Sequence, residues 1–368
     1  MTHLNSLWLW WLAILVITIS VVMLGILWSK LKPLSSSSPL PPGPRSLPVV
    51  GYLPFLGPDL HKQFTNMANT YGPIFKFHMG SKLHVVINTS ELTKVVTRDQ
   101  DHTFANRNLT IAASIITYGG QDIVFSNNSH WRKLRKIFVH EALSNKNLAA
   151  CSYFRSNEVR KTIKNVFGKL GTSIDIRQDV MIVGAETTAT LIEWVMTEIM
   201  KNLDVMKRVQ EELEEIVGLN NIVEEYHLQK LQYLDATIKE TLRLHPILPF
   251  LMPRSPSKDC TVGGYTVPKD STVLLNVWSI HQDPRHWDNP LEFNPDRFLT
   301  YHEAKKSYNG NNLNFFPFGS GRRLCPGLPL AEKMLLFILA SLLHSLTGVC
   351  PRAKSMTFLK NLVLHSRN

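Results

Sequence analysis

The ten residues Phe318-Gly319-Ser320-Gly321-Arg322-Arg323-Leu324-Cys325-Pro326-Gly327 carry the strongest signal in the chain, and an apolar helix is predicted to follow them from about Leu328 to His344. Glycines let a backbone turn tightly and approach a partner closely. Cys325 stands just before the helix, where unpaired amides and the helix dipole favour a thiolate. Arg322 and Arg323 add positive charge that suits an anionic ligand. The plainer interpretation, a buried structural cysteine in a helix-capping loop, leaves the glycines and arginines unexplained.

The composition is that of a large globular protein. The chain has 368 residues, of which 44% are hydrophobic and 19% charged, so it can bury a sizeable core. The formal net charge of +11 indicates an anionic partner, which could be a membrane surface, an acidic protein or nucleic acid. The four cysteines show no CxxC pairing or regular spacing, which argues against a disulfide framework or a zinc site and fits a reducing, cytosol-facing environment.

The N-terminal region predicts a membrane anchor. Leu7 to Trp28 is an uncharged apolar run of 22 residues, and about 20 suffice to span a bilayer core. Lys30 and Lys32 follow this run and no Lys or Arg precedes it, so the positive-inside rule places the rest of the chain in the cytoplasm. A cleaved signal peptide is disfavoured, because the run is long and has neither a basic segment before it nor a small-residue cleavage site after it. We therefore expect residues 1–29 to form an uncleaved anchor in the endoplasmic reticulum membrane.

A linker is predicted to separate this anchor from the globular part. Residues 30–54 contain Ser35 to Ser38 and then Pro41-Pro42-Gly43-Pro44. Proline-rich segments act as semi-rigid spacers. Residues 55–368 are left to form one domain.

A second motif lies inside a strongly apolar helix predicted from Val180 to about Lys201, which contains Val183-Gly184-Ala185-Glu186-Thr187-Thr188. A buried carboxylate is costly, an internal glycine weakens a helix, and a threonine hydroxyl can bend it by bonding to a carbonyl. Together these features predict a local opening that could hold a small ligand and water. The alternative is a core helix in which Glu186 reaches solvent at the edge.

The spacing Phe-x-x-Gly-x-Arg-x-Cys-x-Gly of the opening stretch resembles the heme-binding loop of the cytochromes P450, and five specified positions in ten make a chance match improbable. The resemblance implies that Cys325 is the axial thiolate ligand of a heme (iron protoporphyrin IX), a ligand that favours O–O cleavage. It also implies that other residues of the loop contact the cofactor, namely Phe318, Gly319, Gly321, Arg323 and Gly327.

Further motifs resemble the same family. The helix of Glu186 and Thr187 resembles its oxygen-binding helix, in which these two residues would relay protons to bound dioxygen, although Val183 stands where Ala or Gly is expected. Trp131 and Arg135 are four residues apart and share one face of a helix predicted from residues 129 to 142. The resemblance implies that this pair holds a heme propionate, whereas a solvated basic helix is the plain alternative.

Four more charged residues gain a role only from the resemblance. Arg254 resembles a second propionate ligand. Glu240-x-x-Arg243 alone is a weak signal, but with Arg297 it resembles a buried charge network behind the heme loop. The bidentate geometry of Arg–carboxylate pairs suits a rigid scaffold, so we expect Glu240, Arg243 and Arg297 to act structurally.

The resemblance implies a mostly α fold with a small β region, the cytochrome P450 fold, behind a single N-terminal transmembrane helix. It implies a monooxygenase that inserts one oxygen atom from O2 into a small apolar substrate, with electrons from NADPH through a cytochrome P450 reductase. The basic residues around Arg135 would contribute to the docking face for this acidic partner. The anchor and the proline hinge are most similar to plant microsomal members, which act on terpenoids or phenolics.

The chain departs from the family in two places. Only 56 positions separate Trp131 from Thr187, whereas the family has on the order of a hundred more residues there at ordinary helix and loop lengths. Those residues form helices that roof the substrate pocket. After Leu346 the chain has no Asp or Glu and does not resemble the family's terminal strand pair. Splicing, gene decay and an error in gene prediction would each explain an internal deletion with an altered C-terminus.

Two other functions compete with the monooxygenase interpretation. One is a membrane-anchored remnant that binds heme or the reductase without turnover. The other is a basic, membrane-tethered protein that binds nucleic acid or anionic lipid, which would gather its positive charges in one stripe with interleaved aromatics. The Lys and Arg residues are instead spread through several motifs, so we expect no nucleic-acid partner.

Overall fold

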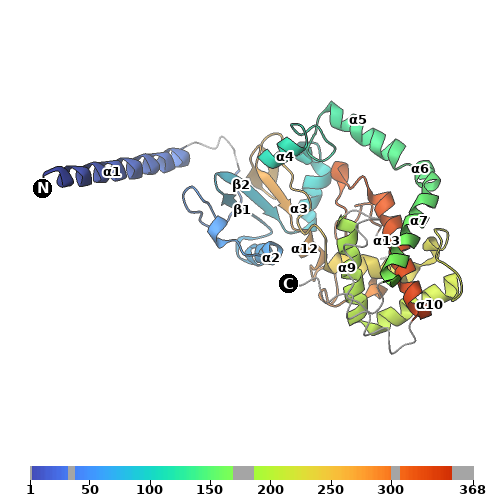
Figure 1. Ribbon diagram of the computed structural model, residues 1–368. Helices are drawn as coiled ribbons and strands as arrows, with labels where there is room; N and C mark the ends of the chain where they lie inside the picture. The colour runs from blue at the N-terminus through green and yellow to red at the C-terminus, as the bar shows by residue number, and fades with distance from the viewer. Residues whose placement is uncertain (1, 32–37, 169–185, 300–306, 350–368) are drawn as a thin grey trace.

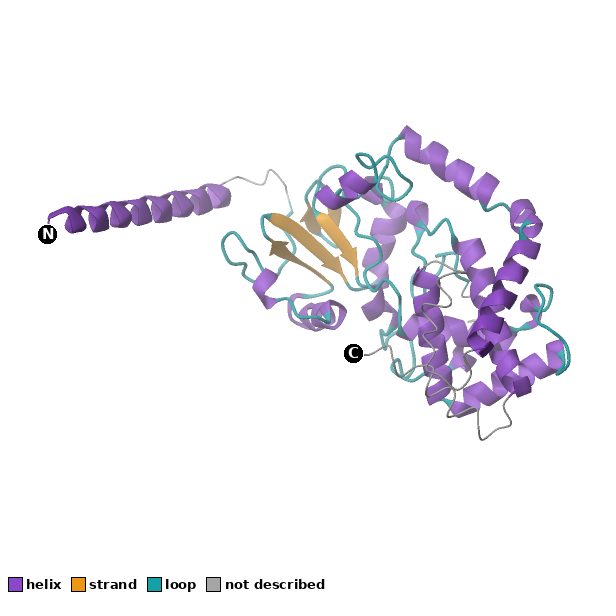
Figure 2. Ribbon diagram, in the orientation of Figure 1, coloured by secondary structure: helices purple, strands orange, loops and turns teal. Residues whose placement is uncertain are grey.

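The computed structural model describes residues 2–31, 38–168, 186–299 and 307–349, and every structural statement below refers to them. A mostly helical body carries a small sheet at one end, and one long helix projects away from it (Figures 1 and 2). Three stretches singled out in the sequence lie outside the described residues: Ser35–Ser37 of the linker, Val183–Ala185 of the second motif, and the tail beyond Val349.

The sheet is built from two chain segments that are far apart in sequence. Strands β1 (Ile74–Met79) and β2 (Lys82–Ile87) form an antiparallel hairpin, and β5 (Thr272–Leu275) pairs in parallel with β2. Strands β3 (Cys260–Val262) and β4 (Tyr265–Val267) form a separate hairpin. Strand β5 ends at Leu275, because the Asn276 side chain accepts from the Ser279 amide and starts a helix there.

Five helices enclose the main core, and α13 (Leu328–Val349) contacts all the others. Their apolar side chains, such as Ile192, Val209, Leu234 and Leu339, are completely buried. The other four helices are α7 (Ser152–Gly168), α9 (Glu186–Lys201), α10 (Leu203–Val217) and α11 (Gln232–Leu244). The predicted helix after the cysteine loop is therefore present and extends beyond His344.

The segment between the hairpin and the core contains one helical irregularity. After α3 (Ser90–Lys94) the chain continues as π-helix from Val95 to Asp99. Ser90 is the first residue of α3, and its hydroxyl lies 3.4 Å from His286 Nε2. The π-helical turn brings Thr97 and Asp101 against the cysteine loop.

An arc of helices runs from the sheet around one side of the body (Figure 1). Its three α-helices are each preceded by a residue whose side chain accepts a backbone N–H, namely Thr110, Asn128 and Ser144. Such caps stabilise helices by about 1 kcal/mol. The arc contains α4 (Ile111–Ile116), α5 (Ser129–Ile137), the π-helical turn Phe138–Ala142 and α6 (Asn145–Ala150).

The remaining elements are short. Helix α2 (Leu60–Tyr71) covers the hairpin, where Phe64 packs on Phe75 and Phe77, and α12 (Val277–His281) packs against α2. The 3₁₀ turns are Leu53–Phe55, Thr103–Ala105, Leu228–Lys230, Pro295–Phe298 and Gly321–Arg323.

Helix α1 (Thr2–Leu31) is the one that projects from the body in Figure 1. The apolar side chains of its stretch Trp10–Met23 are exposed. By length and composition alone, one segment within the described residues is apolar enough to cross a membrane, Leu328–Leu346 of α13. Half of that segment is buried inside the body, which is the behaviour of a core helix.

Candidate cysteine-centred active site

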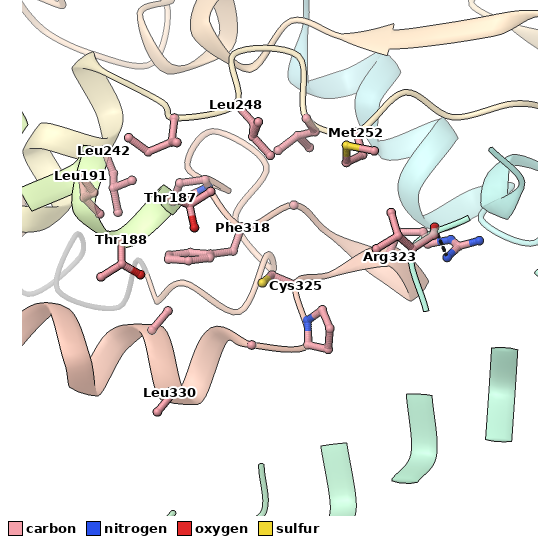
Figure 3. A pocket seen from close by; sticks show the side chains of 18 of the residues that line it. Thr187, Thr188, Leu191, Leu242, Leu248, Met252, Phe318, Arg323, Cys325 and Leu330 are labelled. Atoms are coloured by element: carbon pink, nitrogen blue, oxygen red, sulfur yellow. Dashed lines mark hydrogen bonds between the residues drawn. The ribbon is translucent and has the colours of Figure 1, made fainter. Parts of the chain in front are cut away.

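A cavity of about 710 Å³ lies between the cysteine loop with the start of α13 on one side and α9 with residues 247–254 on the other. Figure 3 shows Cys325 and Phe318 on the loop, Thr187 and Thr188 on α9, and Met252 opposite them. Its walls are mainly apolar. The predicted loop residues Phe318, Gly319, Arg323, Cys325 and Gly327 all line it.

The loop is closed by backbone contacts. The Cys325 N–H donates to the Phe318 carbonyl at 2.9 Å. Gly321 has φ +67°, and a Cβ added there would lie 2.1 Å from the Thr97 carbonyl oxygen. Gly321 therefore does not face the cavity but lets the loop rest on the π-helical turn.

Replacing Gly321 by alanine should destabilise the domain strongly. A left-handed backbone alone costs a non-glycine residue about 1–2 kcal/mol, and displacing a backbone carbonyl adds an overpacking cost of about 1–3 kcal/mol. Gly264→Ala is the matched control, because Gly264 has φ +82° but no atom within 4 Å of an added Cβ. Urea unfolding should show a clearly larger loss for Gly321→Ala, and equal losses would contradict the close packing of the loop.

Four arginines gather beside Cys325, namely Arg107, Arg135, Arg254 and Arg323. Arg107, Arg254 and Arg323 line the cavity, and Arg135 Nη2 donates to the Leu324 carbonyl at 2.7 Å. Burial, reinforced by the neighbouring arginines, lowers the pKa of Arg323 to about 9. Concentrated positive charge in a low-dielectric setting favours an anionic ligand.

The loop arginine is fixed by backbone carbonyls. Arg323 Nε donates to the Ala105 carbonyl at 2.8 Å and Nη1 to the Val124 carbonyl at 3.1 Å. Trp131 is buried beneath it, with the Arg323 guanidinium carbon 4.5 Å from the ring centroid. The Trp131 indole N–H donates to the Ile123 carbonyl at 3.0 Å, so in the structure this residue supports the cluster through its ring face.

Arg107 was not singled out from the sequence. It lines the cavity, its Nη1 donates to the Val124 carbonyl at 2.8 Å, and its Nε is buried without a hydrogen-bond partner within the described residues. Burial lowers the pKa of Arg107 to about 10. An orphaned buried donor beside a cavity indicates a missing acceptor. The sequence held no signal for it, because a lone Arg in a loop has no distinctive spacing.

The second motif is brought to the cavity only in part. Thr187 and Thr188 line it. The expectation of a buried carboxylate is wrong, because Glu186 is exposed in the first turn of α9 and does not line the cavity.

The expected charge network forms away from the cavity. Arg243 makes a bidentate pair with Glu240 at 2.7 and 2.8 Å, and both side chains are 0% exposed. Arg297 Nε lies 3.2 Å from the same carboxylate. Arg243 Nη1 also donates to the His281 carbonyl at 3.0 Å, and His281 Nε2 accepts the Phe316 N–H at 3.0 Å. His281, which the sequence did not single out, therefore connects the network to the segment that enters the cysteine loop.

The site as a whole offers a thiol, apolar walls and an edge of buried arginines. This donor set fits a flat apolar group that carries a thiolate-binding metal and an anionic edge.

Comparisons with known proteins agree with this fit. A family model described as Cytochrome P450 matches residues 41–181 and 176–368. Geraniol 8-hydroxylase of Swertia mussotii is 29% identical over 449 residues, covering 87% of this chain and 90% of that protein. Flavonoid 3'-monooxygenase of Petunia hybrida is 28% identical over 436 residues, covering 83% and 85%. Both alignments are longer than the chain's own 368 residues, so these relatives carry residues with no counterpart here.

A solved structure gives the same fold. A zebrafish cytochrome P450 with abiraterone superposes with a TM-score of 0.68 at 24% identity, covering 77% of this chain and 91% of that one. The family match extends over nearly all of the chain outside its first 40 residues. The chain thus belongs to the cytochrome P450 family.

Proposed function

We propose that Cys325 of this cytochrome P450 monooxygenase binds the heme iron and that the chain oxygenates a small apolar substrate. Heme is the cofactor of the family, and its bound form supplies the oxygen chemistry, which an axial thiolate favours by donating electron density. One observation carries the proposal: the Cys325 thiol, apolar side chains and three arginines line the same cavity.

The arginine cluster fits the carboxylate edge of heme. Arg254, Arg323 and Arg107 line the cavity and would hold the propionates, with Arg135 and Trp131 supporting them from behind. Arg107 Nε, which is buried without a hydrogen-bond partner within the described residues, would gain an acceptor from a propionate. Glu240, Arg243 and Arg297 would brace the loop without touching the cofactor.

Thr187 is the residue proposed to deliver protons to oxygen, through its hydroxyl. Thr187→Val keeps the shape but removes this hydroxyl, so we expect the fraction of NADPH oxidation that yields product to fall about tenfold or more, as for loss of a general acid. Hydrogen peroxide should rise correspondingly while heme content stays constant. Thr190→Val is the control, because the Thr190 hydroxyl bonds the Glu186 carbonyl within α9 and does not line the cavity. Equal coupling in both variants would remove Thr187 from this role.

The walls of the cavity support an apolar substrate. Leu191, Leu248 and Met252 line the side opposite Cys325. The relatives named above are a geraniol hydroxylase and a flavonoid monooxygenase. We therefore infer a terpenoid or phenolic substrate, held by shape and by exclusion of water.

The membrane and the electron donor are proposed from the surface. Helix α1 exposes the apolar side chains of its stretch Trp10–Met23, and it would hold the chain in the endoplasmic reticulum membrane with the catalytic domain in the cytosol. Exposed Arg132, Lys133 and Lys136 on α5 lie on the element that supports the arginine cluster. This basic surface would receive an acidic NADPH-dependent cytochrome P450 reductase.

A second candidate function is favoured by the relatives' additional residues, which have no counterpart in this chain. A distal side open to water would release reduced oxygen rather than transfer it. In that case the chain binds heme or the reductase as an impaired, membrane-anchored protein.

One experiment separates these functions. Membranes that contain the full chain are reduced under carbon monoxide, and terpenoid and phenolic substrates are then supplied with NADPH and reductase. A thiolate-type Soret band with product formation supports the monooxygenase, and the band without product supports the impaired form. Absence of the band overturns Cys325 as the heme ligand.

A further inference from the structure

We propose that Asp101 is a positioning residue of the cysteine loop, whose one carboxylate fixes both the loop backbone at Arg322 and the guanidinium of Arg254. The inference deepens the proposed function, because it concerns the residues that would hold heme. It rests on contacts that neither the sequence motifs nor the proposed heme contacts include.

The two carboxylate oxygens have different partners. Asp101 Oδ2 accepts the Arg322 N–H at 2.9 Å, and Oδ1 accepts Arg254 Nη1 at 3.3 Å. Arg254 Nη2 in turn donates to the Ser320 carbonyl at 2.8 Å. These hydrogen bonds thus connect Asp101, the cysteine loop and the cavity-lining Arg254 to one another.

These hydrogen bonds are sheltered from solvent. The Asp101 side chain is 15% exposed and that of Arg254 4% exposed. Burial lowers the pKa of Arg254, and the Asp101 carboxylate opposes this effect. Charge-assisted hydrogen bonds in such surroundings are stronger than those between neutral groups.

The loop also packs directly on this carboxylate. A Cβ added at Gly321 would lie 3.1 Å from Asp101 Oδ2. Residue 321 is followed by the bonded amide of Arg322, by the cluster residue Arg323 and, two positions later, by Cys325. Releasing the carboxylate would therefore free the loop on the side that carries both the thiol and an arginine of the cluster.

Loss of the Asp101 carboxylate would also remove one of the bonds that orient the Arg254 guanidinium. Its guanidinium is planar, so two bonds from different nitrogens fix the plane in which its remaining N–H groups point. With the Asp101 bond removed, only the bond to the Ser320 carbonyl would hold it. Asp101 thus sets the direction of a cavity donor without touching the ligand.

The chain contains a matched control in the same irregular segment. Asp99 is the last residue of the π-helical turn and is also a carboxylate, but it is 47% exposed and pairs with Lys94 at 3.3 Å. Asp99→Asn and Asp101→Asn therefore make the same chemical change two residues apart. An asparagine at 101 keeps one acceptor but turns an N–H donor toward one of the two donors it must satisfy.

The test has one readout without heme and one with it. In the full-length chain without added heme, hydrogen exchange of the loop amides at residues 319–324 should rise about tenfold in Asp101→Asn, because a charge-assisted bond is lost. Asp99→Asn should match the wild type, and Asp101→Glu should recover part of the protection because it restores the charge. In the heme-loaded protein, Asp101→Asn should lose its thiolate-type band to a heme scavenger about tenfold faster than Asp99→Asn.

Three results would overturn the proposal. These are equal loop exchange in the two asparagine variants, equal heme loss, and loss of the far-ultraviolet helical signal in Asp101→Asn, which would make Asp101 a residue of global folding. If the wild type itself binds no heme, the proposed function fails, and the exchange comparison still decides the role of Asp101.

Discussion

Cys325→Ser should abolish the thiolate-type Soret band of the reduced, carbon monoxide-bound protein completely. This spectrum requires an anionic sulfur ligand. Serine has a hydroxyl in place of the thiol, and that hydroxyl does not ionise near neutral pH. The loop should keep its shape, because the hydrogen bond from residue 325 to Phe318 uses only the backbone. Far-ultraviolet circular dichroism should therefore remain unchanged while the band disappears.

The other described cysteines provide the controls. Cys151 is an exposed free thiol, and burial, aided by Asp259, raises the pKa of Cys260 to about 11. Neither lines the cavity, so Cys151→Ser and Cys260→Ser should both keep the band. A band that persists in Cys325→Ser, or one that vanishes in either control, would show that the thiolate comes from elsewhere.

Arg243→Ala should lower the free energy of unfolding by about 3–5 kcal/mol, because removing one partner of a buried ion pair leaves the other charge poorly compensated. Arg243 is completely buried, and its loss breaks the bidentate pair with Glu240 and the bonds to the His281 and Pro290 carbonyls. The weaker contact of Arg297 with Glu240 remains, at 3.2 Å. Urea unfolding followed by circular dichroism measures the loss.

A second bidentate pair isolates the effect of burial. Arg208 binds Asp296 through two bonds of 2.8 Å, but the two side chains are 46% and 51% exposed. Arg208→Ala should therefore cost no more than about 1 kcal/mol. Similar losses of unfolding free energy in Arg243→Ala and Arg208→Ala would mean that burial of the Arg243 pair does not increase its contribution to stability.

Sequence reasoning succeeded where the signal is local. The apolar run after Gly327 predicted α13, and the i,i+3 spacing of Glu240 and Arg243 predicted a shared helix face. A short apolar segment is less informative, because strand β5 ends at Leu275, where the Asn276 cap begins a helix. Its apolar residues alone do not distinguish a strand from the short helix that follows it.

The parts of the site that sequence reasoning missed depend on contacts between distant segments. Asp101 accepts from Arg322 and Arg254, which lie more than a hundred positions away. Arg107 donates to a backbone carbonyl, and His281 accepts from a backbone N–H. Backbone groups are common to nearly all residues, so the spacing of residue types in a sequence does not predict which backbone group a side chain will contact.

The arginine cluster has a consequence for how much of this protein accumulates in a cell. Packing several positive charges together beside the buried Trp131 opposes folding until an anion neutralises them. A ligand that binds only the folded state stabilises it by mass action. The folded fraction should therefore follow the supply of heme, and starving the cell of heme should send newly made chains to proteolysis.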